Sequence, residues 1–363
     1  MPSFGSDYLA GCHPAILERL IASNLEQTPG YGLDPYCASA RAKIRAAIGD
    51  ENADVHFLVG GTQTNATVIA HILRPHQGVI AAEAAHIATH ETGAIEAAGH
   101  KVLALPSTDG KLTAAQVQDF FTQYYAASDI QEHIVQPGMV YISQPTELGT
   151  VYSRAELAAL AQVCRRHDLP LFVDGARLGY ALHPEVSDVT LADLATLSDV
   201  FYIGGTKCGA LFGEAVVITR DACKPHFRAT MKQHGGLLAK GRLLGIQFDV
   251  LFTDDLYTRI CHDAIAPRPP HPQRLRRARH CLLRRFHHQP AIPHPARSRG
   301  GAFHPRLRLR RLLAGRKRPT NRALLHQLGD HSSGSRGVAG SHLTASRCRR
   351  TDGLMTEVDR QAT

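Results

Sequence analysis

The sequence predicts an α/β fold, with a mostly parallel β-sheet covered by helices on both faces. Short apolar runs alternate with segments whose apolar residues recur at helical spacing, as in strand–helix–strand units. Several apolar runs end in glycine or polar residues, as strands do when they lead into a ligand-binding crevice. The 363 residues are 44% hydrophobic, which is enough to fill a sizeable core.

Ten elements follow from the spacing of apolar residues along the chain. The predicted strands are residues 55–61, 78–82, 101–105, 139–143, 169–176, 199–205 and 214–219. The predicted helices are residues 64–73, 114–127 and 154–167. Four strands lead into VGG, ISQPT, VDGAR and IGGTK. Ligands of open α/β sheets bind at the carboxyl ends of the strands, so chemistry is expected at these four segments.

The charge of the chain changes sign after Asp263. Residues 1–263 contain 19 Lys and Arg against 28 Asp and Glu, a net charge of −9. The last 100 residues contain 22 against 4, a net charge of +18. A uniform basic surface is therefore not predicted, and nucleic-acid binding by the whole chain is disfavoured.

The last hundred residues are rich in arginine, proline and histidine, with no acidic residue from Ala264 until Asp330. Three interpretations compete for this composition. The first is a basic tail that binds nucleic acid, although Lys317 is its only lysine. The second is a disordered tail. The third is that these residues are translated out of frame. Allowed codons for residues 286–291 and 323–331, read one base further on, encode STTNQ and RFCTSWAT.

Cysteine usage and hydropathy favour a cytoplasmic protein. The eight cysteines show neither CxxC nor CxxxC spacing, so neither a zinc site nor a disulfide framework is indicated. The N-terminus lacks a basic start followed by an apolar run, and about 18 uninterrupted apolar residues occur nowhere. Neither a signal peptide nor a membrane span is expected.

Lys207 lies in GGTKCGA, a glycine-rich loop directly after a predicted strand. Taken alone, it is most simply a surface lysine; the alternative is a Schiff-base lysine that condenses with a carbonyl cofactor. Asp174 ends the predicted strand in LPLFVDGARLG, where it either caps a turn or keeps the ring nitrogen of pyridoxal phosphate protonated. One strand–helix–strand step separates the two residues, which predicts both at one sheet edge.

Two further segments fit such a cofactor. VGGTQTN, residues 59–65, joins a predicted strand to a predicted helix, and its amides with the Thr62 hydroxyl would cradle a phosphate. The simpler interpretation is a glycine turn with a threonine cap. The segment lacks GxxxxGK[ST] and GxGxxG, which disfavours a nucleotide-binding fold. His86 could stack on a pyridine ring, although a single histidine is more often structural.

These residues occur in the chain order of fold type I pyridoxal-phosphate enzymes. The chain resembles the threonine aldolase and β-eliminating lyase family (low-specificity L-threonine aldolase-like) over about residues 3–260. The resembling segments are SDYLAGCHP, GYGLDPYC, GGTQTN, EAAHIATHETGAIEAAGHKV, SQPTELGTVY, LFVDGARLGYA, FYIGGTKCGA and KQHGGLLAKGRLLGIQF.

The resemblance implies a pyridoxal 5'-phosphate site with assigned roles. Lys207 would form the Schiff base, Asp174 would pair with the pyridinium nitrogen, and His86 would stack on the ring. The phosphate would be held by Gly61, Thr62 and Gln63. No metal is implied.

The resemblance also assigns residues to the substrate. Ser6 and Arg177 match positions that bind the substrate carboxylate, the arginine by a bidentate pair. Tyr31 lies in a segment that reaches the site near a dimer interface. Where many aldolases carry a histidine near the β-hydroxyl, this chain has Glu147, whose competence as the catalytic base depends on its burial.

The tail departs from the family pattern, which closes a small domain with segments like SPTNQ and RFxTSW. Both are absent from the printed sequence, and both resemble the shifted peptides, so we expect a frameshift near residues 264–268. The predicted organisation is an N-terminal arm of residues 1–20, a large cofactor-binding domain of residues 21–250, and a small-domain remnant of residues 251–363, out of frame and poorly ordered.

The function implied by the resemblance is retro-aldol cleavage of a β-hydroxy-α-amino acid, such as threonine, to glycine and an aldehyde. The expected assembly is a homodimer or homotetramer. One alternative is β-elimination or another amino-acid lyase reaction on the same cofactor. A second is an inactive, frameshifted product with a basic tail.

Overall fold

The computed structural model describes residues 5–126 and 131–265. The chain divides into two units, residues 1–292 and 293–363, and everything described below belongs to the first. The two shifted peptides, and residues 266–268 of the segment in which the frameshift is predicted, lie outside the described residues.

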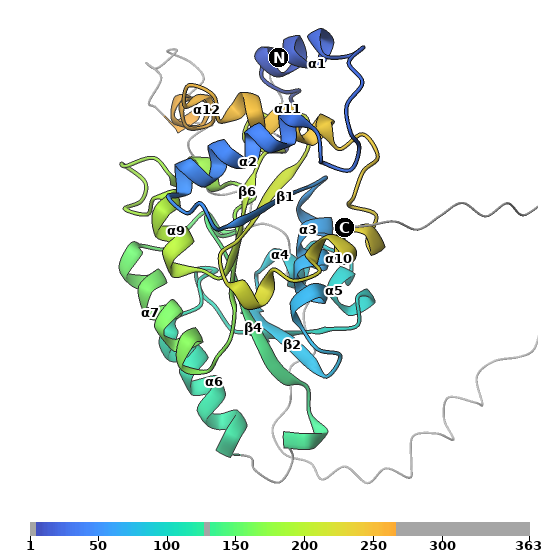
Figure 1. Ribbon diagram of the computed structural model, residues 1–363. Coiled ribbons are helices and arrows are strands. Elements are labelled where there is room, and N and C mark those ends of the chain that lie inside the picture. The colour runs from blue at the N-terminus through green and yellow to red at the C-terminus, as the bar shows by residue number, and fades with distance from the viewer. Residues whose placement is uncertain (1–4, 127–130, 266–363) are drawn as a thin grey trace, which may run out of the picture. The chain divides into compact units, whose positions relative to one another are not determined.

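A seven-stranded sheet forms the centre of this unit, in the order β1-β7-β6-β5-β4-β2-β3 (Figure 1). Neighbouring strands from β3 to β6 are parallel, whereas β7 runs antiparallel to both β6 and β1. The strands are β1 Asp54–Leu58, β2 Gln77–Ala82, β3 Lys101–Leu105, β4 Gln136–Ser143, β5 Leu171–Asp174, β6 Val200–Gly204 and β7 Glu214–Ile218. All seven overlap the predicted strands, so the predicted α/β sheet is confirmed.

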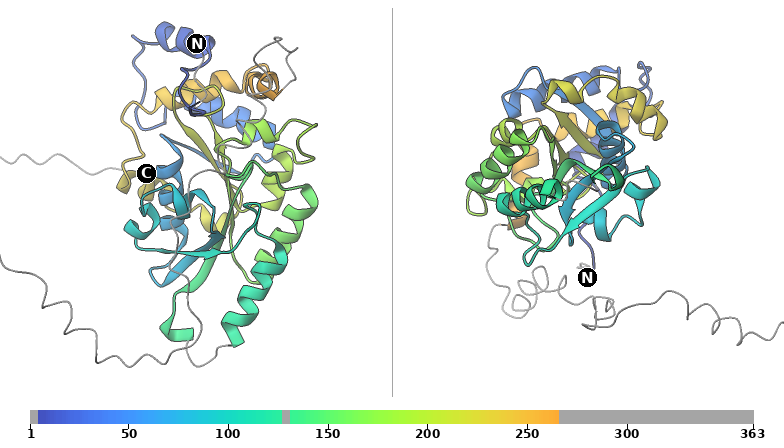
Figure 2. Two further views of the ribbon diagram at one scale, coloured as in Figure 1. Left: turned by 180° about the vertical axis from the view of Figure 1, so that it is seen from behind. Right: turned by 90° about the horizontal axis from the view of Figure 1, so that it is seen from below.

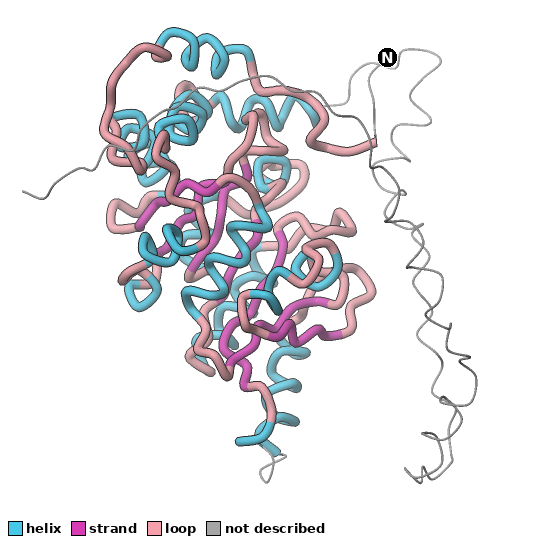
Figure 3. The backbone as a smooth tube through the Cα atoms, turned by 90° about the vertical axis from the view of Figure 1, so that its right-hand side faces the viewer, coloured by secondary structure: helices cyan, strands magenta, loops and turns pink. Residues whose placement is uncertain are grey.

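Helices cover both faces of the sheet (Figures 1 and 2), and Figure 3 shows the strands between them. One layer contains α2 Pro35–Ile48, α6 Ala114–Ala126, α7 Arg154–Arg166 and α9 Leu191–Leu197. The other contains α3 Gly61–Ile72, α4 His86–Thr89, α5 Ala94–Ala97 and α10 Phe227–Gln233. The remaining α-helices are α1 Pro14–Ala22, α8 Leu178–Ala181, α11 Arg242–Leu251 and α12 Leu256–Ile265. Short 3₁₀ turns occupy Gln131–His133 and Asp221–Cys223.

Local sequence signals explain where several helices begin. The Ser153 hydroxyl accepts the Glu156 N–H while the Glu156 carboxylate accepts the Ser153 N–H, a capping box that starts α7. Asp34 caps α2 with Pro35 in its first turn. No helix of the described residues is long and apolar enough to cross a bilayer.

The site lies where the strands end. Because β7 reverses direction between β6 and β1, the strands β1, β2, β4, β5 and β6 all run the same way, and their carboxyl ends share one edge. Close backbone approach at this edge requires Gly175, where an added Cβ would lie 1.9 Å from the Tyr202 carbonyl oxygen. The two central strand ends, which carry Asp174 and the Lys207 loop, are thereby held together.

Candidate active site

Asp174 is the best-anchored residue of the strand-end cluster. It is buried at the end of β5, and the hydroxyl of Tyr141, on the neighbouring β4, donates to its Oδ2 at 2.5 Å. The amide of Asn65, in α3, donates to the same oxygen at 3.2 Å, and the Ala176 N–H donates to Oδ1 at 3.0 Å. These three donors stabilise the charged carboxylate, as an anion that pairs with a pyridinium requires.

His86 begins α4 after β2 and lies beside a second buried carboxylate. Its Nδ1 lies 2.8 Å from Glu91 Oε1, and the Asn65 amide also donates to that oxygen at 2.7 Å. The hydrogen bond with Glu91 raises the pKa of His86, against the effect of burial, and Asp174 and Glu147 add to the rise. His86 is half-buried, with 29% of its side chain exposed.

The first turn of α3 provides an anion-binding end. The helix starts at Gly61 without a side-chain cap, so the amides of Gly61, Thr62 and Gln63 are available to an anion. The alternative interpretation, a threonine cap, is not supported, because the N-cap residue is Gly60 and no side chain caps the helix. The Gln63 side chain is engaged elsewhere: it accepts from the Val59 N–H at 3.2 Å and donates to the His234 carbonyl at 3.0 Å. Its backbone amide, rather than its side chain, is the group suited to a phosphate.

Lys207 follows β6 on a loop held at several points. The Tyr180 hydroxyl donates to the Lys207 carbonyl at 2.6 Å, and the Gly205 and Thr206 amides donate to the Gly213 carbonyl at 2.9 and 3.1 Å. Neither a hydrogen bond nor an ion pair joins its ammonium to another described residue. Burial lowers the pKa of His90, and the nearby positive charges of His86, Arg177 and Lys207 lower it further. The amine therefore lies in the same electrostatic neighbourhood as the other candidates.

Glu147 lies on the loop after β4. It is half-buried, and the Ser143 hydroxyl donates to its Oε1 at 2.7 Å. Burial, with the negative charge of Asp174 as the second cause, raises the pKa of Glu147. A carboxylate with a raised pKa is a better proton acceptor near neutral pH than an exposed one.

Arg177 connects this edge to the N-terminal arm. Burial alone would lower its pKa, but Asp7, Asp174 and Glu147 raise it. The Arg177 Nε donates to the Asp7 carboxylate, and the His13 N–H donates to the Gly209 carbonyl at 2.9 Å. The arm therefore contacts both Arg177 and the lysine loop, and the role of Ser6, the neighbour of Asp7, stays a prediction.

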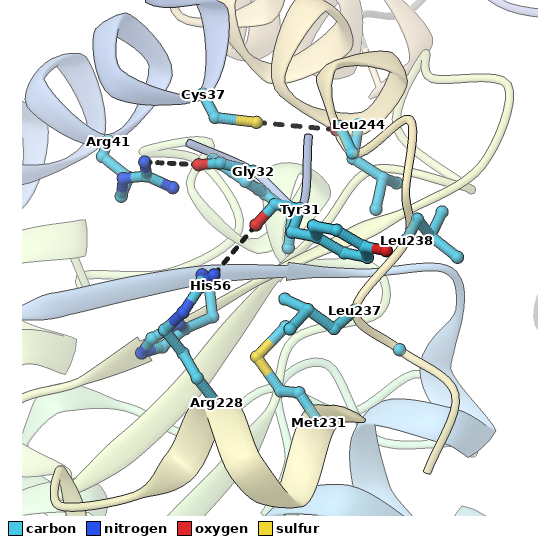
Figure 4. A pocket seen from close by; sticks show the side chains of 13 residues that line it. Tyr31, Gly32, Cys37, Arg41, His56, Arg228, Met231, Leu237, Leu238 and Leu244 are labelled. Carbon is cyan, nitrogen blue, oxygen red and sulfur yellow. Dashed lines mark hydrogen bonds between the residues drawn. The ribbon is translucent and has the colours of Figure 1, made fainter. Parts of the chain in front are cut away.

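Tyr31 lies in a different pocket, which Figure 4 shows. Arg228 of α10 donates to its carbonyl at 3.0 Å, and the Lys232 ammonium lies 4.7 Å from the centre of its ring. Among the described residues no recorded contact joins Tyr31 to Lys207, Asp174 or His86. Its assignment to the substrate through a subunit interface stays a prediction.

Sequence reasoning missed four polar residues that hold the site together. They are buried and form hydrogen bonds that the spacing of the sequence does not display: Asn65, Glu91, Tyr141 and Glu214. Asn65 could have been identified from the sequence, because it is the last residue of the VGGTQTN segment and lies one helical turn beyond Gly61.

The residues fit pyridoxal phosphate in three respects. A firmly held carboxylate suits the ring nitrogen, an amine without a partner among the described residues suits the aldehyde, and an uncapped helix end suits the phosphate. All three lie at the carboxyl ends of strands that run in one direction.

This fold and donor set define a pyridoxal-phosphate enzyme of fold type I. A solved threonine aldolase from Leishmania major is 48% identical, with a TM-score of 0.69 over 71% of this chain and 74% of that chain. An aspartate aminotransferase variant from Thermus thermophilus shows the same fold at 15% identity, with a TM-score of 0.55 over 70% of this chain and 69% of that one.

The sequence profile of the beta-eliminating lyase family matches residues 3–316, and the chain belongs to this family. A low specificity L-threonine aldolase from Pseudomonas aeruginosa is 32% identical over 265 residues, which are 72% of this chain and 74% of that protein. The predicted fold class and the predicted family are both confirmed.

Proposed function

We propose that this chain is a pyridoxal-phosphate-dependent lyase that cleaves the Cα–Cβ bond of a β-hydroxy-α-amino acid, such as threonine, to give glycine and an aldehyde. The observation that carries the proposal is the pairing of Lys207 and Asp174 at adjacent strand ends, in a chain that belongs to the beta-eliminating lyase family.

The cofactor would be held by groups at the carboxyl ends of four strands, β1, β2, β5 and β6. Lys207 would bind its aldehyde covalently, Asp174 its ring nitrogen and His86 its ring face. The phosphate would be bound by the backbone amides of Gly61, Thr62 and Gln63. When bound, the cofactor supplies an electron sink for the pair that the breaking Cα–Cβ bond leaves on Cα.

The chain's own residues would orient the substrate and move its proton. Arg177, with Ser6 beside it, would bind the carboxylate and set the Cα–Cβ bond perpendicular to the cofactor ring. Glu147 would take the proton from the β-hydroxyl, so that the aldehyde can leave as the bond breaks. The burial that raises the pKa of Glu147 supports this role.

Lys207→Ala tests the cofactor assignment. The purified protein with added pyridoxal phosphate is expected to show a visible absorption band, and the variant is expected to lose both this band and aldehyde release from threonine. Lys101→Ala, at an exposed position in β3, is the control and should keep both. In Glu147→Gln, the band should stay while aldehyde release falls to background. A band that persists in Lys207→Ala would contradict the proposal.

A second reaction deserves the same assay because the family is described as beta-eliminating. Elimination from the same site would release ammonia and a keto acid, whereas retro-aldol cleavage releases glycine and an aldehyde. We expect aldehyde and glycine in equal amounts. Ammonia as the main product would show that the site catalyses β-elimination rather than retro-aldol cleavage.

We further propose that the chain acts as a homo-oligomer, a dimer or a tetramer. Large apolar side chains of the N-terminal segment, α1 and α11 are exposed, an arrangement that favours a protein partner over water. They are Leu9, Leu17, Ile21, Leu25, Leu33 and Leu243. A second copy is the occupant expected for an enzyme of this family.

Two remaining predictions have direct tests. The six described cysteines are all free, in keeping with a reducing cytoplasm, and fractionation of the source cells tests that location. The frameshift near residues 264–268 is tested by sequencing the coding DNA across codons 255–335. Restoration of STTNQ and RFxTSW by one base would support it.

A further inference from the structure

Glu91 is a buried carboxylate at the centre of a polar chain that joins four parts of the fold. Its side chain has no exposed surface. One oxygen, Oε1, is shared between His86 Nδ1 at 2.8 Å and the Asn65 amide at 2.7 Å. The same Asn65 amide reaches Asp174 Oδ2 at 3.2 Å. The helices that carry His86 and Asn65, α4 and α3, lie in the same layer of Figure 1.

A carboxylate in this position is costly unless something stabilises its charge. The other oxygen of Glu91, Oε2, is buried and has no hydrogen-bond partner among the described residues. A buried, incompletely paired carboxylate lowers the free energy of unfolding. A contribution to stability therefore does not explain why a glutamate occupies this position. The polar contacts of Glu91 are with His86 and Asn65, and the former is the group that its charge can serve.

Asn65 explains how two carboxylates coexist at this edge. An amide nitrogen carries two hydrogens and no charge, so it can donate to Glu91 and Asp174 together. It thereby reduces the repulsion between two like charges that would otherwise favour protonation of one of them. The Asn65 amide therefore bridges Glu91, the partner of His86, and Asp174, the residue proposed to bind the cofactor nitrogen.

The geometry fixes the His86 ring. Because Glu91 Oε1 faces Nδ1, the proton on that nitrogen points at the carboxylate, and Nε2 is turned away from it. The ring is also stacked on His90, with 5.6 Å between the ring centres. The titratable and charged groups that act on His86 are Glu91, Asp174, Glu147 and His90, and of these the hydrogen bond with Glu91 has the largest effect on its pKa.

We propose that Glu91 is a positioning residue: its carboxylate faces His86 Nδ1, holds the ring in one orientation, and stabilises the ring when both of its nitrogens carry a proton. The inference rests on the proposed function, since it assumes that His86 faces the cofactor. A protonated ring there would favour the role of the bound cofactor as an electron sink.

The decisive variant is Glu91→Gln, which keeps the shape of the side chain and removes its charge. In the cofactor-free protein, NMR titration of the His86 ring is expected to show its midpoint at lower pH than in the wild type. Glu96→Gln, an exposed glutamate five residues further on, should leave the titration unchanged. An unchanged His86 midpoint in folded Glu91→Gln would overturn the proposal.

The role of Glu91 through His86 is tested by a double-mutant cycle. Glu91→Gln is expected to weaken cofactor binding by about tenfold, because a neutral amide stabilises a protonated ring less than a carboxylate does, and to move the pH profile of kcat/KM. In a His86→Phe background both effects should vanish. Equal losses in the two backgrounds would show that Glu91 acts on the fold and not on His86.

The controls separate this inference from the proposed function. The titration uses no cofactor, so it stays informative if Lys207→Ala leaves the visible band unchanged. If Glu91→Gln shows no cooperative thermal unfolding, Glu91→Asp replaces it: the shorter side chain keeps the charge but lengthens the contact, and the His86 midpoint should shift in the same direction by less. A midpoint equal to that of the wild type would again overturn the proposal.

Discussion

Glu214 holds the lysine loop through a single carboxyl group. It is the first residue of β7 and is 3% exposed. The Gly205 N–H donates to its Oε2 at 3.1 Å and the Thr206 hydroxyl donates to its Oε1 at 2.8 Å. Burial raises the pKa of Glu214 to about 8, although these two hydrogen bonds oppose the rise. The residues directly before Lys207 are therefore fixed by a group that titrates near neutral pH.

The stability of the fold should depend on this titration. Between the ordinary glutamate pKa of 4.5 and about 8, the folded chain binds a proton that the unfolded chain has released. The free energy of unfolding therefore decreases as pH rises through this window, by a few kcal/mol, since one pKa unit is worth about 1.4 kcal/mol. Glu214→Gln should remove this dependence, because its amide can accept from Gly205 and donate to Thr206.

Urea unfolding at several pH values from 5 to 9 checks the prediction. Glu214→Gln should be more stable than the wild type above pH 8, and Glu96→Gln should follow the wild-type curve. Parallel curves for the wild type and Glu214→Gln would show that the carboxyl group does not titrate in this range.

Some site residues could be predicted from the sequence, and the others depend on contacts that it does not display. Lys207 and Asp174 each end an apolar run, so their place at a sheet edge follows from local spacing. Glu91 interrupts no pattern in the sequence, and its role depends on contacts with His86 and Asn65 that form only in the folded chain. In the sequence, Glu214 resembles any polar residue at the start of a strand, because its contacts with Gly205 and Thr206 form only in the folded chain.

At the scale of elements, the site depends on how closely β5 and β6 approach each other beyond their paired residues. Gly175 directly follows β5, where a Cβ would lie 1.9 Å from the Tyr202 carbonyl oxygen and 3.1 Å from the Leu178 Cβ. Neither a backbone carbonyl nor a packed helix can move aside at low cost. A side chain here would push apart the strand ends that carry Asp174 and Lys207.

Gly175→Ala should therefore destabilise the protein by at least about 3 kcal/mol, the upper end of what overpacking usually costs. Thermal unfolding by circular dichroism measures the effect. Gly11→Ala is the matched control, because a Cβ there meets no atom within 4 Å. Equal melting temperatures for the two variants would show that the strand ends can separate freely.

The apolar pattern located the strands but left the direction of β7 open. Strands buried on both faces have the same composition whichever way they run, so the residues 214–218 carry no signal for the reversal. The antiparallel direction follows from the short link after β6, which has no helix in which to cross over.

For the whole molecule, the exposed apolar side chains of the N-terminal segment and α1 predict an assembly. Ile21 and Leu25 are 76% and 91% exposed. Ile21→Lys and Leu25→Lys should shift an oligomer toward the monomer, because a charge in a buried interface is costly. Sedimentation velocity measures this shift, and Val186→Lys, at a 38% exposed position in the loop after α8, is the control. A wild-type protein that sediments as a monomer would contradict the proposal.

The reversal of β7 affects how much conformational entropy the lysine loop loses when the cofactor binds. Residues 205–213 form the one link between consecutive strands of the described sheet that contains no helix, and both of its ends are paired in the sheet where Gly204 faces Glu214. The backbone of Lys207 therefore loses its conformational freedom when the protein folds. The enzyme does not lose that entropy again each time it takes up cofactor, so more of the binding free energy remains for the ring and the phosphate.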